Sequence, residues 1–226
     1  EWYVESQPDW VTLNKTSGTG KTEIKLTFAE MPQGSEPREG EVVFMLKGQD
    51  YRTRCKVTQY DYQYAEDEFI TLQEATKGNG KLNIVLLGDG YNAKDISEGQ
   101  LLKNVEEAYG HFFDIEPYLT YKDYFNVYTV FGMSADSGMG TVNTIREARF
   151  GSQYTLNEGV TPDFETVFAG ACVAPINDDV STTLIILIEN SNEYSGLCYM
   201  YGDGSAVAIC PMSSDPAPYD FRGLVH

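Results

Sequence analysis

Few side chains in this chain of 226 residues could bind a metal ion through nitrogen or shuttle protons near neutral pH, because its only histidines are His111 and His226. A Ser-His-Asp catalytic arrangement would need one of the two. Asp89 is a third candidate, since it stands in a Gly-Asp-Gly turn after an apolar run. Its carboxylate could bind a metal ion or accept a phosphoryl group, but an Asp in such a turn more often hydrogen-bonds nearby backbone N–H groups.

The same turn invites comparison with esterases that carry Gly-Asp-Ser at this place. Their nucleophile would stand at position 90, and Gly90 has no side chain. A seryl mechanism at this turn is therefore excluded, because acyl transfer needs an activated hydroxyl. A hydrolase that uses another serine remains an open alternative.

The elements on either side position the turn. Residues 82–91 read LNIVLLGDGY, and a continuous apolar run closed by glycine is typical of a strand buried on both faces. Residues 95–113 carry apolar side chains at three- and four-residue steps, which predicts an amphipathic helix. Strand, turn and helix open an α/β layer, in which ligand sites lie beyond the carboxyl ends of the strands.

The rest of the second segment continues to alternate strands with helices. Such alternation favours a largely parallel sheet with helices packed on it. Residues 190–204 are expected to form a long loop. Further strands are predicted over residues 124–132, 181–189 and 206–210, and helices over residues 143–150, starting at residues 161–163, and starting near residue 219.

The first 60 residues read as all-β, with short alternating stretches that suggest an immunoglobulin-like β-sandwich. Residues 2–4 and 10–13 fit a first hairpin, and further strands are predicted over residues 22–28, 41–46 and 51–60. The charge balance changes near residue 65. Residues 1–65 carry eight basic and ten acidic side chains, whereas residues 66–226 carry eight and 24. We therefore predict two domains, residues 1–65 and residues 66–226.

Composition argues against several classes of protein. The formal net charge of −18 disfavours a nucleic-acid partner, because phosphate binding needs clustered Lys and Arg. The four cysteines show no C-x-x-C spacing, which disfavours a structural zinc site of the thiolate type. No stretch reaches the length of a transmembrane helix. Residue 1 falls inside a strand-like pattern, so an export segment is expected to have been removed before it.

Three stretches near the N-terminus form a recognisable pattern: W-Y-V-E-S-x-x-D-W-V-T-L-x-x-x-S-G, R-E-G-E-V-V-F and V-T-Q. The pattern resembles the BACON domain, and the matching residues are Trp2, Ser6, Trp10, Gly18, Gly40 and Gln59. The resemblance implies a small sandwich beside a catalytic module of a secreted gut-bacterial protein, with a glycan as a partner. Trp2 and Trp10 are themselves expected to be mainly core residues, since buried aromatics dominate such cores.

Four stretches of the second segment form another pattern: N-I-V-L-L-G-D-G-Y, E-E-A-Y-G-H-F-F, E-P-Y-x-T-Y-x-D-Y-F-N-V-Y and F-R-G-L-V-H. Together they resemble the metallopeptidase family typified by bacterial immunoglobulin-A peptidase. The resemblance implies an α/β zincin-like domain with a mostly parallel sheet and a zinc cofactor. It also implies a secreted or cell-surface endopeptidase that acts on host or dietary proteins or glycoproteins.

In that family the F-R-x-L-V-H run leads into a helix with a His-Glu zinc motif, so the resemblance implies that His226 is a zinc ligand. Histidines one helical turn apart hold the ion, and the Glu takes a proton from the zinc-bound water. No Glu follows His226 in this sequence. The chain is therefore expected to stop at the active-site helix, to contain no catalytic residue of its own and to be inactive, with the Glu beyond residue 226.

In zinc peptidases of this plan, an edge strand above the active helix pairs with the substrate backbone. Ala206, Val207 and Ala208 lie on the short strand predicted before that helix, so they are the candidates for substrate binding, although an ordinary sheet strand is equally expected. The leading hypothesis is thus the N-terminal part of a secreted zinc endopeptidase. The alternative is a non-catalytic surface protein that binds glycans or mucin through the sandwich.

Overall fold

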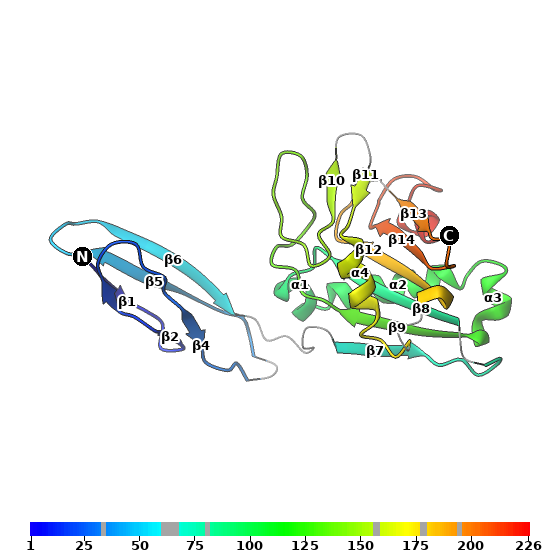
Figure 1. Ribbon diagram of the computed structural model, residues 1–226, viewed down its shortest axis with the longest axis horizontal. Helices are drawn as coiled ribbons and strands as arrows, with labels where there is room; N and C mark the ends of the chain where they lie inside the picture. The colour runs from blue at the N-terminus through cyan, green and yellow to red at the C-terminus, as the bar shows by residue number, and fades with distance from the viewer. Residues whose placement is uncertain (33–34, 60–67, 80–81, 156–158, 177–179, 194–195) are drawn as a thin grey trace. The chain divides into compact units, whose positions relative to one another are not determined.

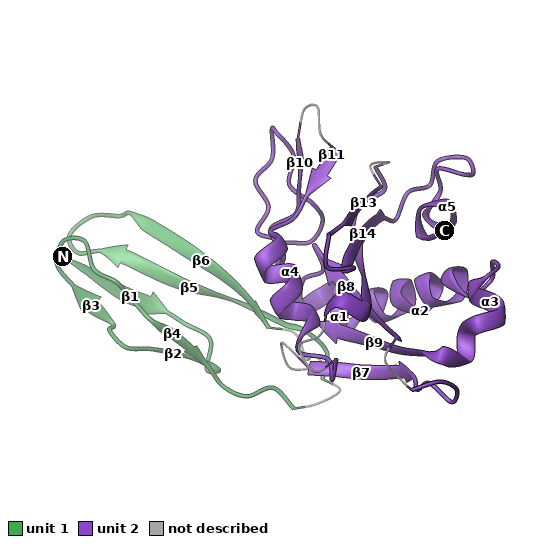
Figure 2. Ribbon diagram, turned by 45° about the vertical axis from the view of Figure 1, so that its right-hand side comes forward, with its two compact units in different colours: residues 1–61 green, residues 62–226 purple. Residues whose placement is uncertain are grey.

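The computed structural model describes residues 1–32, 35–59, 68–79, 82–155, 159–176, 180–193 and 196–226. The chain divides into two compact units, unit 1 (Glu1–Asp61) and unit 2 (Tyr62–His226), shown in Figures 1 and 2. No helix in the described ranges is long and apolar enough to cross a membrane.

Unit 1 consists of two antiparallel sheets that share one core. Val11 and Leu13 from the smaller sheet and Val42 and Val57 from the larger sheet are buried together. The predicted hairpin between the first two strands is wrong, because β1 pairs with β3 and β5 whereas β2 pairs with β4. The larger sheet has the order β3-β1-β5-β6; the strands are β1 (Trp2–Ser6), β2 (Val11–Leu13), β3 (Ser17–Gly18), β4 (Leu26–Phe28), β5 (Arg38–Leu46) and β6 (Arg52–Gln59).

Unit 2 is organised around one large sheet with the order β13-β14-β12-β8-β9-β7 (Figure 1). The central strands β14, β12, β8 and β9 are parallel, whereas β13 and β7 run antiparallel to their neighbours. The predicted parallel arrangement is thus confined to the centre, and the sheet as a whole is mixed. The strands are β7 (Glu68–Gln73), β8 (Leu82–Asp89), β9 (Phe125–Phe131), β12 (Thr183–Glu189), β13 (Leu197–Met200) and β14 (Ala206–Pro211), and a separate hairpin joins β10 (Gln153–Thr155) to β11 (Gly159–Thr161).

The central strand β8 is the apolar run that the sequence singles out. Its residues Ile84, Val85, Leu86 and Leu87 are each at most 1% exposed. Ile84 and Leu86 belong to the core that includes α2 (Gln100–Phe112), and Val85 and Leu87 belong to the core that includes α4 (Phe164–Ala171). Burial on both faces explains why the run is continuous and does not alternate.

The predicted helix over residues 95–113 is two helices, α1 (Ala93–Ser97) and α2. They are separated at Gly99, whose φ of 76° lies in the left-handed region that suits glycine and ends the first helical path. Helix α4 begins as predicted, with the Asp163 side chain accepting the N–H groups of Glu165 and Thr166. The helix predicted over residues 143–150 is wrong, since these residues form turns and loop. Short helical turns connect the larger elements at α3 (Tyr118–Tyr121), Lys122–Tyr124 and Val180–Thr182.

Two strands of the large sheet lie where the sequence indicates connections. β7 lies just after the predicted domain boundary, where no strand is predicted, and β13 falls in the loop predicted over residues 190–204. Both are short, and most of their residues are half-buried or exposed. A strand at the end of a sheet needs no continuous apolar run, so the pattern that identifies β8 is missing from them.

Candidate functional site

Helix α5 (Phe221–Val225) is the element expected to lead into an active-site helix. Asp220 caps it, because its carboxylate accepts the Gly223 N–H at 3.0 Å. Phe221 and Val225 are buried in the core that contains α2 and β14. The packing of this short helix brings His226 to the end of α2.

His226 contacts oxygen atoms at the end of α2. Its Nε2 lies 2.7 Å from Oδ1 of Asp114 and 3.0 Å from the carbonyl oxygen of His111. Both oxygens are acceptors, so this nitrogen carries a hydrogen. Arg222 Nη2 lies 3.0 Å from Oδ2 of the same carboxylate. Desolvation would raise the pKa of Asp114, but the bonds from His226 and Arg222 outweigh it and hold that pKa below its ordinary value.

The described residues do not form a zinc site. They contain no group of three or more His, Cys, Asp or Glu side chains that could hold a metal ion. Nε2 of His226 donates to oxygen, so only Nδ1 of this ring is left to bind a metal ion, and one nitrogen alone does not make a zinc site. The donor set therefore does not fit a catalytic zinc ion, and the ligand role of His226 stays a prediction.

The serine-hydrolase alternative needs a histidine beside a serine. Nε2 of His111 lies 3.5 Å from Oε1 of Glu107, and its Nδ1 lies 3.8 Å from Oδ2 of Asp114. The His111 ring packs edge-on against the Phe221 ring, with 6.0 Å between centroids. His226 is engaged by Asp114 and by a backbone carbonyl. Among the described residues neither histidine has a hydrogen bond to a serine hydroxyl, so neither is placed to activate one.

The strand β14, which contains Ala206, Val207 and Ala208, is not an edge strand. It pairs in parallel with β12 on one side and antiparallel with β13 on the other. Its backbone groups are used within the sheet, so it has no free edge for an added peptide strand. The edge assignment is therefore wrong, and a substrate contact of these three residues stays a prediction.

The edge of the described sheet on this side is β13. The Tyr201 N–H donates to the Ser205 carbonyl at 2.9 Å. Hydrogen-bonded and non-hydrogen-bonded residues alternate along an antiparallel strand pair, so the backbone groups of Tyr199 also point toward β14. The N–H and C=O groups of Cys198 and Met200 then point away from the sheet. Such outward-facing peptide groups are a template for an extended peptide.

Helix α5 lies against the start of this edge strand. A Cβ atom at Gly196 would collide with the side chain of Leu224, so the helix packs directly on the backbone there. The Cys210 thiol lies 3.6 Å from the Leu224 carbonyl oxygen, which ties the helix to β14. The helix that leads to His226 and the free edge of the sheet are therefore neighbours.

Asp89 lies at the carboxyl end of β8 and is fully buried. One of its oxygens accepts the N–H groups of Gly90 at 3.1 Å and Phe150 at 2.9 Å, and the other accepts the N–H of Ser152 at 3.1 Å. This is the backbone-binding role expected of an Asp in such a turn. Since the carboxylate is sealed from solvent, it fixes a loop and does not meet a substrate.

Glu189 is the cross-strand neighbour of Asp89 at the end of β12, and it is also fully buried. In the described part of the chain neither of its carboxylate oxygens has a hydrogen-bond partner. Burial, and then the charge of Asp89, raise the pKa of Glu189 well above its ordinary value. Sequence reasoning missed Glu189, because a Glu at the end of an apolar run is expected to be the first exposed residue after the strand.

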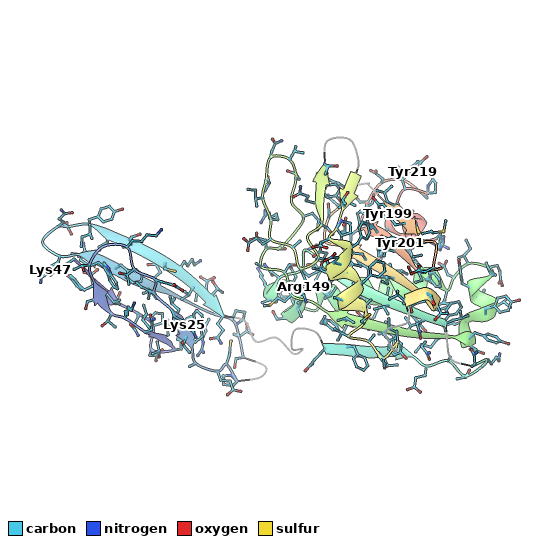
Figure 3. All side chains as sticks on the ribbon, in the orientation of Figure 1. Lys25, Lys47, Arg149, Tyr199, Tyr201 and Tyr219 are labelled. Atoms are coloured by element: carbon cyan, nitrogen blue, oxygen red, sulfur yellow. The ribbon has the colours of Figure 1, made fainter. Side chains whose placement is uncertain are left out.

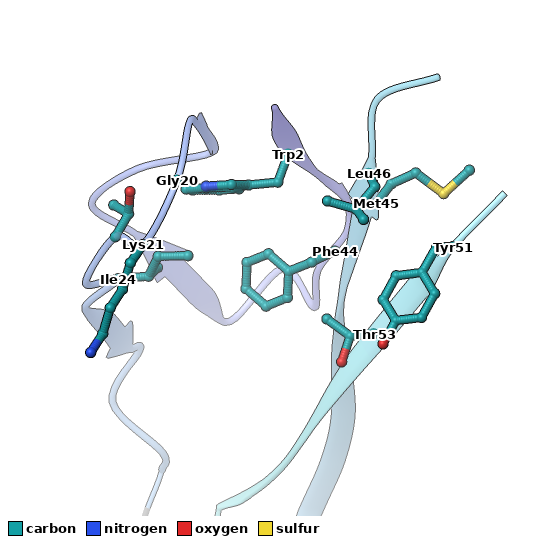
Figure 4. Close-up of a pocket in the computed structure, with 10 residues that line it drawn as sticks. Trp2, Gly20, Lys21, Ile24, Phe44, Met45, Leu46, Tyr51 and Thr53 are labelled. Atoms are coloured by element: carbon teal, nitrogen blue, oxygen red, sulfur yellow. The ribbon is translucent and has the colours of Figure 1, made fainter. Parts of the chain in front are cut away.

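Unit 1 carries a cavity of about 390 Å³ beside Trp2 (Figure 4). Phe44 and Tyr51 contribute aromatic rings to its wall. The Trp2 indole is packed and not free: a Cβ at Gly18 would come within 2.7 Å of it, and Phe44 meets it edge-on with 6.0 Å between ring centroids. Trp2 therefore packs within unit 1, and Tyr51, 59% exposed, is the more accessible ring.

Comparison with known families gives two matches. The model of the IgA Peptidase M64 family matches residues 70–212, which is more than half of the chain and includes β8, α2, β12 and β13. The model of the BACON domain matches residues 1–60. Helix α5 and His226 lie outside the first match. No curated protein matches the chain.

Proposed function

Because the chain belongs to the IgA peptidase M64 family, a family of metallopeptidases, we propose that it is a zinc-dependent endopeptidase that hydrolyses host or dietary proteins. The observation that carries this proposal is the family match over residues 70–212. The N-terminal unit is a BACON domain. A protein or glycoprotein is therefore the proposed substrate.

The free edge of β13 supports a peptide substrate. Its outward-facing backbone groups at Cys198 and Met200 can bond an extended chain whatever its side chains are. The edge lies beside α5, which leads to His226. In this proposal β13 takes the role that the sequence assigns to β14.

The proposed zinc ion is not held by the described residues, whose donors do not fit it. His226 is the proposed ligand on the resemblance of residues 221–226 alone, through Nδ1 if its Nε2 keeps the bond to Asp114. Further ligands would have to come from outside the described residues. The 226-residue chain by itself is accordingly proposed to be inactive.

An assay on casein and immunoglobulin, with added zinc and then with a chelator, tests this proposal. The 226-residue chain should cleave neither protein, and any longer form that its gene encodes should cleave at least one and stop when the metal is removed. Zinc-dependent cleavage by the short form would contradict the claim that its donor set is incomplete. A longer form that neither binds zinc nor cleaves would contradict the peptidase assignment, and His226→Ala in that form is the matched control.

Secretion or display at the cell surface is part of the same proposal. It is supported by the sequence resemblances described above, which imply an exported protein. Immunoblotting of culture medium, cell surface and cytoplasm measures it directly. Protein confined to the cytoplasm would contradict it.

A second candidate function is glycan or mucin binding by unit 1. The cavity beside Trp2 favours it, because the exposed ring of Tyr51 and the hydroxyl of Thr53 stand at its wall (Figure 4). Loss of glycan binding in Tyr51→Ala, with an unchanged melting temperature, would support this function. Equal glycan binding by the variant and the parent chain, or no binding by either, would contradict this second function.

A further inference from the structure

Four aromatic side chains gather beside the free edge of β13. Phe164 lies 4.8 Å from Tyr199 between ring centroids, and Phe168 lies 5.5 Å from Tyr201. Phe164 also meets Tyr201 at 6.2 Å, so the rings form one continuous cluster. We call Phe164, Phe168, Tyr199 and Tyr201 the aromatic shelf; the two tyrosines are labelled in Figure 3.

The shelf is partly open to solvent. Tyr201 is 38% exposed, and Phe164, Phe168 and Tyr199 are half-buried. The buried sides of the other three rings pack on the core beneath α4. Rings that are packed on one side and open on the other form a rigid apolar surface.

A peptide that bonds to the outward backbone groups of β13 would place one of its side chains beside the aromatic shelf. A peptide that bonds to Cys198 and Met200 would place its intervening residue opposite Tyr199. Side chains of directly opposite residues lie on the same face of a sheet, with Cβ atoms about 4.5–5.5 Å apart. That peptide residue would therefore face the α4 side of the sheet, where the shelf lies.

We propose that the aromatic shelf is a side-chain subsite, and that this edge binds extended peptides with an aromatic or large aliphatic residue opposite Tyr199. The inference rests on the proposed peptidase function for its biological use, but the binding itself requires no hydrolysis. Backbone bonding to β13 gives affinity without sequence preference. The shelf adds the preference, because an apolar side chain laid on it is removed from water.

The first test measures binding to the 226-residue chain by fluorescence anisotropy. One probe is a labelled peptide of Thr and Ser residues with a single central Phe, and the matched probe has Ser at that place. The Phe probe should bind about tenfold more tightly, since aromatic pairs and apolar burial add to the backbone contacts. Tyr201→Ala should lower the affinity for the Phe probe to that for the Ser probe and leave the affinity for the Ser probe unchanged.

A second test addresses the backbone contacts. Met200→Pro removes an N–H that points away from the sheet, so it should abolish binding of both probes while the melting temperature of unit 2 stays near that of the parent. Met200→Ala keeps the N–H and is the matched control. A Phe probe with N-methylated amides should also fail to bind, and this arm needs no change in the protein.

Equal affinity for the two probes, or an equal loss of both in Tyr201→Ala, would overturn the shelf as a subsite. Full binding of the N-methylated probe would overturn the edge as its docking place. Failure of the peptidase proposal is separable, because a longer form that binds the Phe probe but cleaves nothing would leave the subsite standing. If the longer form is active, Tyr201→Ala should raise KM for the Phe peptide and leave kcat unchanged.

Discussion

The two units bury their sheets to different degrees. In unit 2 the large sheet is covered on both faces, and each face has its own apolar core. In unit 1 the buried core consists of Val11, Leu13, Val42 and Val57, with partly buried neighbours around it. Since hydrophobic stabilisation grows with the area removed from water, we expect unit 2 to be the more stable of the two.

The units also differ in where they keep their charges. The outer face of the larger sheet in unit 1 carries surface ion pairs, which include Arg52 with Glu5 and Lys56 with Glu39. Unit 2 has surface ion pairs too, such as Arg222 with Asp114, but it also buries Asp89 and Glu189 side by side at the end of its sheet. A unit with a thin core and paired surface charges should respond to salt, whereas a unit with buried carboxyl groups should respond to pH.

The largest expected effect tests the cores directly. Leu87→Ala in unit 2 should cost about 4 kcal/mol of unfolding free energy, because Leu87 is fully buried between two layers. Leu13→Ala in unit 1 should cost about 2 kcal/mol, because the looser surroundings can close around the cavity. Both tryptophans lie in unit 1, so denaturation followed by tryptophan fluorescence reports that unit, and helical circular dichroism reports unit 2. Equal losses of unfolding free energy in the two units would contradict the claim that the core of unit 2 is the more tightly packed.

A smaller effect is expected from Trp10 in unit 1. Its ring lies 4.6 Å from the Arg38 guanidinium and 6.0 Å from the Phe28 ring, and it is half-buried. Trp10→Ala should cost about 2–3 kcal/mol, somewhat below a fully buried aromatic. Trp10→Phe, which keeps a ring there, should lose less than half of that. Urea unfolding followed by the remaining Trp2 fluorescence measures both, and an unchanged midpoint in Trp10→Ala would contradict a structural role for the ring.

The sequence predicts the centre of the large sheet well and its edges poorly. β8 and β12 are continuous apolar runs because both of their faces are covered, and that requirement is local. β13 has one covered face and one free edge, so its four residues resemble a loop. The hairpin predicted in unit 1 is wrong for another reason. Alternation of apolar and polar residues indicates which side of a strand is buried, but not which strand pairs with it.

The site is less predictable than the fold, because its contacts join distant parts of the chain. His226 and Asp114 are 112 residues apart in sequence and meet only because α5 packs on α2. The resemblance identifies His226 as a candidate, but no local pattern indicates that its Nε2 already has two oxygen partners. Likewise, the burial of Glu189 follows from strand pairing with Asp89, which local periodicity cannot supply.

The pH dependence of unit 2 is the next prediction. The pKa of Glu189 is raised in the folded protein, so the folded state binds this proton more tightly than the unfolded state does. The stability gained is complete below the ordinary Glu pKa and is lost as pH rises toward the raised value. The midpoint of unit 2 in thermal circular dichroism should therefore fall by a few degrees from pH 5 to pH 8.

Glu189→Gln should remove this pH dependence, because an amide does not titrate. Glu193→Gln, which changes an exposed carboxylate nearby, should keep it and is the matched control. A parent protein whose unit 2 becomes more stable between pH 5 and pH 8 would contradict the assignment of a protonated, buried Glu189.

The smallest effect is expected at the surface of unit 1, and it has the opposite pH sign. The bond from Arg52 lowers the pKa of Glu5, so this pair stabilises the folded state above the ordinary Glu pKa and stops doing so as pH falls. Arg52→Ala should lower the fluorescence midpoint slightly at low salt, and the difference should vanish near 1 M salt, where the screening length is about 3 Å. Arg52→Lys keeps the charge but loses the paired N–H geometry, so it should fall between the parent and Arg52→Ala. A loss in Arg52→Ala that persists in high salt would mean that the Arg52 side chain stabilises unit 1 by packing, and the contrast between a salt-sensitive unit 1 and a pH-sensitive unit 2 would not hold at this pair.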